Sequence, residues 1–269
     1  MYLSVIIPTC NRNDLLKLCL DQLKPGVQTL DSNLYEVIVT DDSTDELSKQ
    51  LIQGSYPWVK WVKGPRKGPA ANRNNGARHG KGDWLVFTDD DCLPIANWLS
   101  LYAVAISNSD KTKVFEGCTI PDRSQKRYDE RAPVNETGNR LWSCNFAIPK
   151  NIFFEIGEFD ESFPYAAMED ADLQKRILNH TEIIFLREAK IIHPWRKIKP
   201  FKDFKKHLVS HRIFKRKHNT QRFLQYKWSR VKILLGDLFF ETKLLIRYKF
   251  TGIGIYVEKH LLNICLVFI

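Results

Sequence analysis

Residues 84–92 read WLVFTDDDC, an apolar run of strand length that leads directly into three consecutive carboxylates. A buried strand with this ending brings negative charge to one edge of a sheet, where loops meet ligands. Carboxylates this close repel one another and raise one another's pKa unless a cation lies among them. Asp89, Asp90 and Asp91 therefore predict a divalent-metal site, although a solvated acidic turn has the same composition. An oxygen-only ligand set favours Mg²⁺ or Mn²⁺, with a substrate diphosphate as the usual further partner.

Apolar runs of strand length alternate with helical periodicity on the N-terminal side of this stretch. We expect strands at 3–7, 35–40, 58–62 and 84–88. We expect helices at 13–23, through 47–52 and at 70–79. This alternation predicts an α/β fold with a doubly wound, mostly parallel sheet flanked by helices, and with its ligand crevice at the carboxyl ends of the strands. Three polar loops, 9–12, 41–43 and 89–91, should meet there.

The pattern becomes less regular after Asp91. We expect a helix at 95–106, strands at 114–120, 141–148, 182–185 and 190–193, a short helix at 152–157, and another helix marked by Leu173, Ile177 and Leu178. Residues 121–138 are charged and poor in apolar side chains. A loop of this length in a compact domain is usually functional or mobile.

Length and composition limit the class of protein. A chain of 269 residues with 43% hydrophobic residues fits one large domain, or one domain with an appendage. The six cysteines form no Cys-x-x-Cys pair, which favours unpaired thiols in a reducing compartment. The opening residues lack a basic region and reach Pro8 before a signal-length apolar segment develops, so we expect no export.

The net charge of +10 is concentrated in the C-terminal part, where residues 196–260 hold 18 Lys and Arg against four Asp and Glu. Aromatic and aliphatic residues alternate with these basic residues over 199–250, and no apolar run is long enough to cross a bilayer. This pattern is typical of amphipathic helices that lie in the interface of an anionic membrane. The alternative is that the helices pack on the main domain and expose a cationic face. Residues 261–269 are apolar and fit the same interface or a second subunit of a homo-oligomer.

Five motifs, in this order along the chain, resemble the family 2 glycosyltransferases, which have the nucleotide-binding fold called GT-A. They are Ser4–Arg12, Val39–Asp45, Ala71–Gly76, Asp89–Asp91 and Glu169–Asp170. The resemblance covers roughly residues 3–195. It implies a GT-A catalytic domain at 1–195, with a nucleotide-sugar half at about 1–92 and an acceptor half at about 93–195, followed by a basic amphipathic helical tail at 196–269.

The resemblance also implies an activity and a location. Members of the family join a sugar from a nucleotide-sugar donor to an acceptor hydroxyl, usually with inversion at the anomeric carbon. We therefore expect an inverting, metal-dependent glycosyltransferase that uses a UDP-sugar or a dTDP-sugar. Its acceptor would be a glycan or a lipid-linked glycan in cell-surface polysaccharide synthesis. We expect it in the cytoplasm, peripheral on the inner face of the membrane.

Metal-site roles follow from the resemblance. It implies that Asp91 is the principal ligand of Mn²⁺ or Mg²⁺ and that Asp89 contacts the ribose or a metal-bound water, with Asp90 beside them. His193 stands where many GT-A enzymes have a histidine that completes the metal shell, and neutral imidazole suits Mn²⁺. A histidine before a proline is also commonly a packed or turn residue.

Nucleotide contacts follow in the same way. The resemblance implies that Pro8, Thr9 and Arg12 line the nucleotide pocket and that Asp41 is the uracil-binding acid. A carboxylate there accepts the ring N–H, which favours uridine or thymidine over purines. Arg73 is expected beside the diphosphate because a guanidinium matches phosphate oxygens, and its alternative is a charge on the surface of a helix.

The resemblance implies that Asp170 is the general base, which removes the acceptor proton while the hydroxyl attacks the anomeric carbon opposite the diphosphate. In isolation, acids in the first turn of a helix simply complement its dipole.

Two other classes of protein share some of these features. A nucleic-acid-binding protein would use the basic tail, but the positive charge avoids the motif-bearing region, so no nucleic acid is expected. A sugar nucleotidyltransferase would also need metal carboxylates, but this chain has no Gly-rich, Lys-bearing N-terminal loop.

Overall fold

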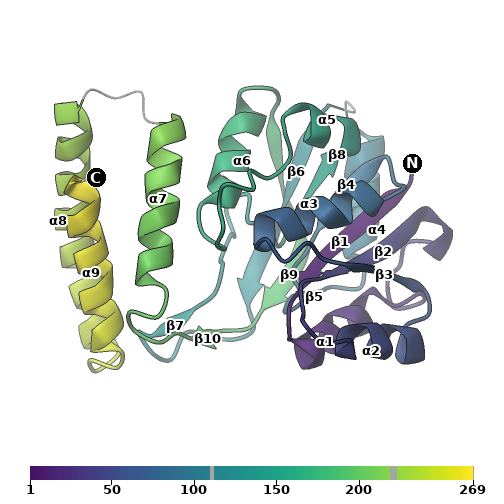
Figure 1. The fold of residues 1–269 in the computed structure, drawn as a ribbon, viewed down its shortest axis with the longest axis horizontal. Coiled ribbons are helices and arrows are strands. Elements are labelled where there is room, and N and C mark those ends of the chain that lie inside the picture. Colours follow the sequence, from purple (N-terminus) through teal and green to yellow (C-terminus); the bar gives the residue numbers. More distant parts are fainter. Residues whose placement is uncertain (110–111, 219–222, 269) are drawn as a thin grey trace. The chain divides into compact units, whose positions relative to one another are not determined.

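The computed structural model describes residues 1–109, 112–218 and 223–268, the side chains of 223–226 excepted (Figure 1). The chain divides into two compact units. Unit 1 comprises Met1–Asp122 and Pro133–Pro194, and unit 2 comprises Arg123–Ala132 and Trp195–Ile269. Residues 123–132, part of the long loop expected from the sequence, therefore group with the C-terminal helices. The assignment of 1–195 as one catalytic domain stays a prediction.

One half of the unit 1 sheet is parallel. Its strands, in spatial order, are β3 (Val59–Lys63), β2 (Tyr35–Asp41), β1 (Leu3–Thr9) and β4 (Trp84–Phe87). These strands are rich in β-branched residues, and β1 and β4 are buried along their whole length, as parallel strands covered on both faces are. The predicted strands are confirmed to within about two residues at each end.

The other half of the sheet is mixed. After β4 follow β8 (Phe146–Pro149), β6 (Val114–Pro121), β9 (Ile183–His193) and β5 (Leu93–Pro94). Among the described strands of this half, β6 and β9 pair in parallel and the other neighbours pair antiparallel. With the three parallel pairs of the first half, the sheet is mostly parallel, as predicted.

Three predicted elements of this half have different bounds in the structure. The two short strands expected at 182–185 and 190–193 are one strand, β9, whose register against β6 shifts between Gly117 and Cys118. The strand expected from 141 begins only at Phe146, because Glu116 accepts hydrogen bonds from the backbone N–H groups of 139–141 and holds them out of a ladder. The helix expected from 95 begins at Trp98, because Leu93–Pro94 pair with β9 first.

Helices cover both faces of the sheet (Figure 1). One core contains apolar side chains of α1 (Asn13–Leu23), α2 (Leu47–Ser55) and α4 (Trp98–Ser107). The other contains side chains of α3 (Pro69–His79), α5 (Lys150–Glu155) and α6 (Glu169–Leu178). A short 3₁₀ helix, Ser32–Leu34, precedes β2. Consecutive residues of β1 alternate between the two cores, as the strand period of two requires. The layers leave the carboxyl edge of the parallel strands to the loops that form the site.

Unit 2 consists of helices and one small ladder. In the ladder, β7 (Glu130–Arg131) pairs with β10 (Arg196–Lys197). The helices are α7 (Phe204–His218), α8 (Phe223–Arg247) and α9 (Ile253–Phe268), which confirms the expected C-terminal helices. A small apolar core contains Tyr128, Leu245 and Ile255. Among the residues that the structure describes, no helix combines the length and the apolar character needed to cross a membrane.

Candidate active site

The loops after β1 and β4 meet at the carboxyl edge of the sheet. Thr9 Oγ1 donates to Asp90 Oδ2 at 2.7 Å, and Arg12 Nε donates to the same oxygen at 3.0 Å. The loop after β2 joins them, because Asp42 N donates to the carbonyl of Thr9 at 2.9 Å. The predicted convergence of the three loops is therefore confirmed.

Asp90 lies beneath this edge. It is fully buried, and burial raises the pKa of its carboxyl group to about 7 against the lowering effect of Arg12. It contacts Thr9 and Arg12, both expected to line the nucleotide pocket. The structure thus gives Asp90 an orienting position under those residues. Its own contact with a nucleotide stays a prediction.

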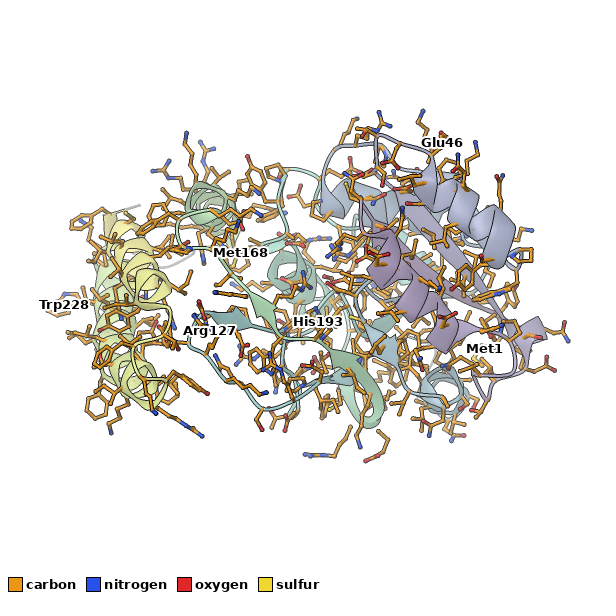
Figure 2. All side chains as sticks on the ribbon, turned by 90° about the horizontal axis from the view of Figure 1, so that it is seen from below. Met1, Glu46, Arg127, Met168, His193 and Trp228 are labelled. Atoms are coloured by element: carbon orange, nitrogen blue, oxygen red, sulfur yellow. The ribbon has the colours of Figure 1, made fainter. Side chains whose placement is uncertain are left out.

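Asp91 and His193 lie together although 102 positions separate them in the sequence. His193, the last residue of β9 (Figure 2), has its Nε2 3.3 Å from Asp91 Oδ1, and both side chains are buried. Arg12 Nη1 also lies 3.1 Å from Asp91 Oδ2. Cys92 completes a group whose possible ligand atoms all lie within 4.8 Å of one another. One carboxylate oxygen and one imidazole nitrogen at this spacing fit Mn²⁺, so the residues present suit the expected metal.

Arg73 connects two acidic segments. On α3, its Nη2 donates to Asp89 Oδ1 at 2.8 Å and its Nη1 to Glu169 Oε1 at 3.3 Å. Arg73 is only 4% exposed, so the alternative of a helix-surface charge is wrong. The guanidinium also lies 5.6 Å from the centre of the Phe159 ring. Through Arg73, the loop after β4 and the start of α6 form one cluster.

Helix α6 begins directly after Met168, whose backbone has a positive φ of 71° (Figure 2). Asp170 is partly exposed there, and its Oδ1 accepts a hydrogen bond from Ala171 N at 2.7 Å. The buried surroundings raise the pKa of Asp170 to about 6. Burial, followed by the charge of Asp170, raises the pKa of Glu169. A carboxylate with a pKa near neutrality is suited to accept a proton, while its place in the first turn also complements the helix dipole.

The remaining predicted nucleotide residues lie at the ends of β1 and β2. Pro8 and Thr9 are buried in β1. Asp41 is also buried, and it accepts hydrogen bonds from Ser43 N at 2.8 Å and Trp61 Nε1 at 3.3 Å. Each carboxylate oxygen has a second lone pair, so these contacts leave acceptor capacity for a base. The uracil-binding role of Asp41 stays a prediction.

Two further residues of the site, Glu169 and Cys92, are not predicted from the sequence. In the sequence Glu169 is only the first residue of the Glu–Asp motif. In the structure it is the buried partner of Arg73, and its Oε2 has no hydrogen-bond partner among the described residues. In the sequence Cys92 is one of six cysteines without a pairing pattern. Its position directly after Asp91 was the available signal. Neither its burial nor the proximity of His193 follows from that position alone.

Comparison with solved structures identifies the fold. Staphylococcus aureus TarS 1–349, solved in complex with UDP-GlcNAc, superposes with a TM-score of 0.61 at 21% identity, over 79% of this chain and 65% of that one. GalNAc-T7, solved with UDP, GalNAc and Mn²⁺, gives a TM-score of 0.57 at 20% identity, over 74% of this chain and 44% of that one. The chain thus has the GT-A fold, with additional C-terminal helices.

The family follows from a comparison of the sequence. Residues 4–168 match the model of glycosyl transferase family 2, and the chain belongs to that family. Asp170 and His193 lie after the matched range.

Two curated relatives are informative. A Haemophilus influenzae protein named an uncharacterized glycosyltransferase is 40% identical over 192 residues, which are 65% of this chain and 62% of that protein. The GalNAc(5)-diNAcBac-PP-undecaprenol beta-1,3-glucosyltransferase of Campylobacter jejuni is 31% identical over 173 residues, 62% of this chain and 53% of that protein. The chain therefore spans about half to six-tenths of the length of these relatives.

Proposed function

We propose that this protein is an inverting, metal-dependent glycosyltransferase that moves a sugar from a UDP-sugar or dTDP-sugar to an acceptor hydroxyl. The observation that carries the proposal is the position of Arg73 between Asp89 and Glu169. This bridge ties the loop of the Asp-x-Asp motif to the segment that holds Asp170, so the donor diphosphate and a general base would meet at one cluster. The proposed catalytic domain is 1–195.

Glycosyl transfer develops negative charge on the departing diphosphate, and the site must neutralise that charge. Asp91 and His193 would hold Mn²⁺ or Mg²⁺, and a bound divalent cation supplies Lewis-acid stabilisation of the leaving group. Arg73 would bind the diphosphate with the guanidinium donors that remain beside its two ion pairs. Arg12 would hold the metal-binding carboxylate in place through its contact with Asp91.

The donor nucleotide would lie over the ends of β1 and β2. Pro8 and Thr9 would line the pocket, Asp41 would accept the N–H of a uracil or thymine ring, and Asp89 would contact the ribose or a metal-bound water. Asp90 would orient Thr9 and Arg12 from below. Two structural neighbours, one solved with UDP-GlcNAc and one with UDP, support a uridine nucleotide.

Asp170 would act as the base. Its carboxylate takes the proton of the acceptor hydroxyl, the hydroxyl oxygen forms a bond to the anomeric carbon, and the bond from that carbon to the diphosphate oxygen breaks with its electron pair on the diphosphate. Attack from the side opposite the leaving group gives inversion. The pKa of about 6 allows Asp170 to be deprotonated at neutral pH while remaining a competent proton acceptor.

The proposed acceptor is a lipid-linked glycan of cell-surface polysaccharide synthesis. The name of the Campylobacter relative, which specifies an undecaprenol-linked acceptor, supports this class. We propose that the enzyme works on the inner face of the membrane and that its basic helical tail contacts anionic lipid.

A donor screen tests the proposal. The purified chain is incubated with UDP-, dTDP- and GDP-sugars in the presence of Mn²⁺, with and without a lipid-linked acceptor, and released nucleotide is quantified. We expect UDP or dTDP to be released, and the anomeric configuration of the product to be opposite to that of the donor. Release of pyrophosphate from a nucleoside triphosphate and a sugar phosphate would instead identify a nucleotidyltransferase. Retention of configuration would contradict a single displacement by the acceptor hydroxyl with Asp170 as its base.

A further inference from the structure

Helix α9 has a stripe of exposed apolar side chains along one face. Its large side chains recur every three or four residues, which places them on one face of the helix. They are 42% to 75% exposed and comprise Ile253, Val257, Leu261, Ile264 and Phe268. A soluble helix normally exposes its polar face, so this stripe is the reverse of the usual arrangement.

Helix α8 has the same feature. Trp228, Leu235, Phe239 and Ile246 are separated by seven, four and seven positions, so they lie on one face of the helix, and each is 56% to 67% exposed. Trp228 projects away from the helices of its unit in Figure 2. Lys243 lies with its Nζ 4.0 Å from the centre of the Phe239 ring, so a cation borders the apolar stripe.

A set of polar side chains joins the two helices on their facing sides, whereas Lys232, Lys243 and Arg247 of α8 are exposed. Lys259 on α9 pairs with Glu241 at 2.5 Å and lies 3.7 Å from Asp237, both on α8. Asn263 on α9 donates to Asp237 Oδ2 at 2.9 Å, and Arg230 on α8 donates to Asn263 Oδ1 at 3.4 Å.

Two further contacts extend this polar seam. Tyr128 donates to Glu241 Oε2 at 2.6 Å, and the hydroxyls of Thr242 and Tyr256 lie 2.8 Å apart. The seam joins α8 to α9 while the apolar stripes point outward. Groups that pair internally and leave apolar side chains outside are typical of helices whose surroundings are apolar.

We propose that the hairpin of α8 and α9 is a membrane-docking element whose outer apolar stripes are buried at the headgroup–acyl boundary of an anionic bilayer. Charge complementarity selects the bilayer as the occupant. Residues 196–260 carry 18 basic and four acidic residues, and each basic residue near an anionic surface adds to binding. Apolar stripes flanked by Lys and Arg match the interface, where the stems of these side chains are buried and their charges remain at the headgroups.

The docking element deepens the proposed function, because it names the residues through which an enzyme acting on a lipid-linked acceptor would contact the membrane. The polar seam would hold the two helices of the docking element together. If α8 and α9 separated at the surface, Asp237 and Glu241 would face lipid without Lys259, which is costly. The seam therefore keeps the hairpin together when its outer face is in the acyl region.

Vesicle co-sedimentation of the full chain tests the docking element. The wild type is compared with a Leu235→Glu, Phe239→Glu double variant on vesicles of equal parts phosphatidylcholine and phosphatidylglycerol. The matched control is a Val104→Glu, Leu178→Glu double variant, which introduces the same charge at two exposed apolar positions of unit 1, both 56% exposed. Because all four positions are exposed, both variants should fold, and circular dichroism and thermal unfolding verify this.

We expect wild type and control to bind the anionic vesicles, and the Leu235→Glu, Phe239→Glu variant to bind at least about tenfold more weakly, since it loses the burial of two large apolar side chains. Equal binding by both variants would refute the docking element, as would failure of the wild type to bind at low salt. A wild-type dimer in sedimentation equilibrium that the Leu235→Glu, Phe239→Glu variant breaks would show that a second copy covers the stripes. UDP binding, measured without vesicles, reports on the proposed function separately.

Discussion

Arg73 on α3 donates to Asp89 Oδ1 at 2.8 Å, so a helix on one face of the sheet is tied to the acidic loop at the sheet's edge. The same guanidinium also meets Glu169 at the start of α6. Three segments that are distant in the sequence are therefore held by one buried cation. This bridge makes the stability of the unit and the geometry of the proposed site depend on the same residue.

Replacing Arg73 should destabilise the fold. In Arg73→Met, Asp89 and the buried Glu169 lose their cation, and we expect the free energy of unfolding to fall by about 3–5 kcal/mol. The measurement is urea denaturation followed by circular dichroism. Arg78→Met is the matched control, because Arg78 lies on the same helix and is half exposed, and its ion pairs with Glu158 and Glu161 are more exposed than those of Arg73. We expect a loss of less than about 1 kcal/mol there. Similar losses in the two variants would show that the buried bridge contributes no more than a surface pair.

Asp170→Asn should abolish the chemical step without removing the donor. We expect the transfer rate to fall by at least about 100-fold, because the variant has no carboxylate to accept the proton. UDP affinity should stay within about twofold of the wild type in calorimetry. For the wild type, the rate should rise with pH through about 6, where Asp170 loses its proton. Glu155→Gln, at an exposed position of α5, is the control and should remain active. An active Asp170→Asn enzyme would place the base elsewhere.

The raised pKa of Glu169 gives a pH dependence of stability in the metal-free protein. The carboxyl group titrates at about 7 when folded, because burial and Asp170 favour its protonated form, and near 4 when unfolded. Between these values the folded state holds the extra proton, so stability should decrease as pH rises from about 4 to 7. Urea unfolding of the wild type and Glu169→Gln across this range measures the effect. The variant should lose part of the slope, and an unchanged slope would assign it to other groups.

Manganese affinity tests the proposed metal site of Asp91 and His193, two residues that are far apart in the sequence. His193→Ala removes one proposed ligand, and we expect Mn²⁺ affinity, measured by electron paramagnetic resonance, to decrease by at least about tenfold. His180→Ala is the control, because His180 is exposed and lies 3.8 Å from Glu155 at the surface. An unchanged affinity in His193→Ala would leave the histidine as a packed residue at the end of β9.

Patterns local in the sequence predict the parallel half of the sheet and the convergence of its loops. Each of β1, β2 and β4 is an apolar run that ends in polar residues, and the carboxyl ends of parallel strands must share an edge. The late start of β8 depends on Glu116, and the burial of Arg73 depends on Glu169. Both acids are far away in the sequence from the residues that they contact, so local patterns do not predict these features. For the same reason the sequence indicated amphipathic character in the tail, but not which face of α8 and α9 lies outward.

Two glycines in helices should respond to the same substitution with opposite sign. A Cβ at Gly76 of α3 would lie 2.6 Å from Ile6 Cγ2 and 3.0 Å from Thr40 Cγ2, so in Gly76→Ala the helix or these side chains of β1 and β2 must shift. Such overpacking typically costs about 1–3 kcal/mol, which equals or exceeds the gain of about 1 kcal/mol in helix propensity.

A Cβ at Gly54 of α2 would meet nothing within 4 Å, so Gly54→Ala keeps the propensity gain alone. We expect urea midpoints to fall for Gly76→Ala and to rise for Gly54→Ala. If both variants were stabilised, α3 would have room to move off the sheet. Arg73 lies on the same helix, so its hydrogen bond to Asp89 would then tolerate a shift of α3. The position of the guanidinium would depend on its ion pairs and not on the close packing of the helix against the sheet.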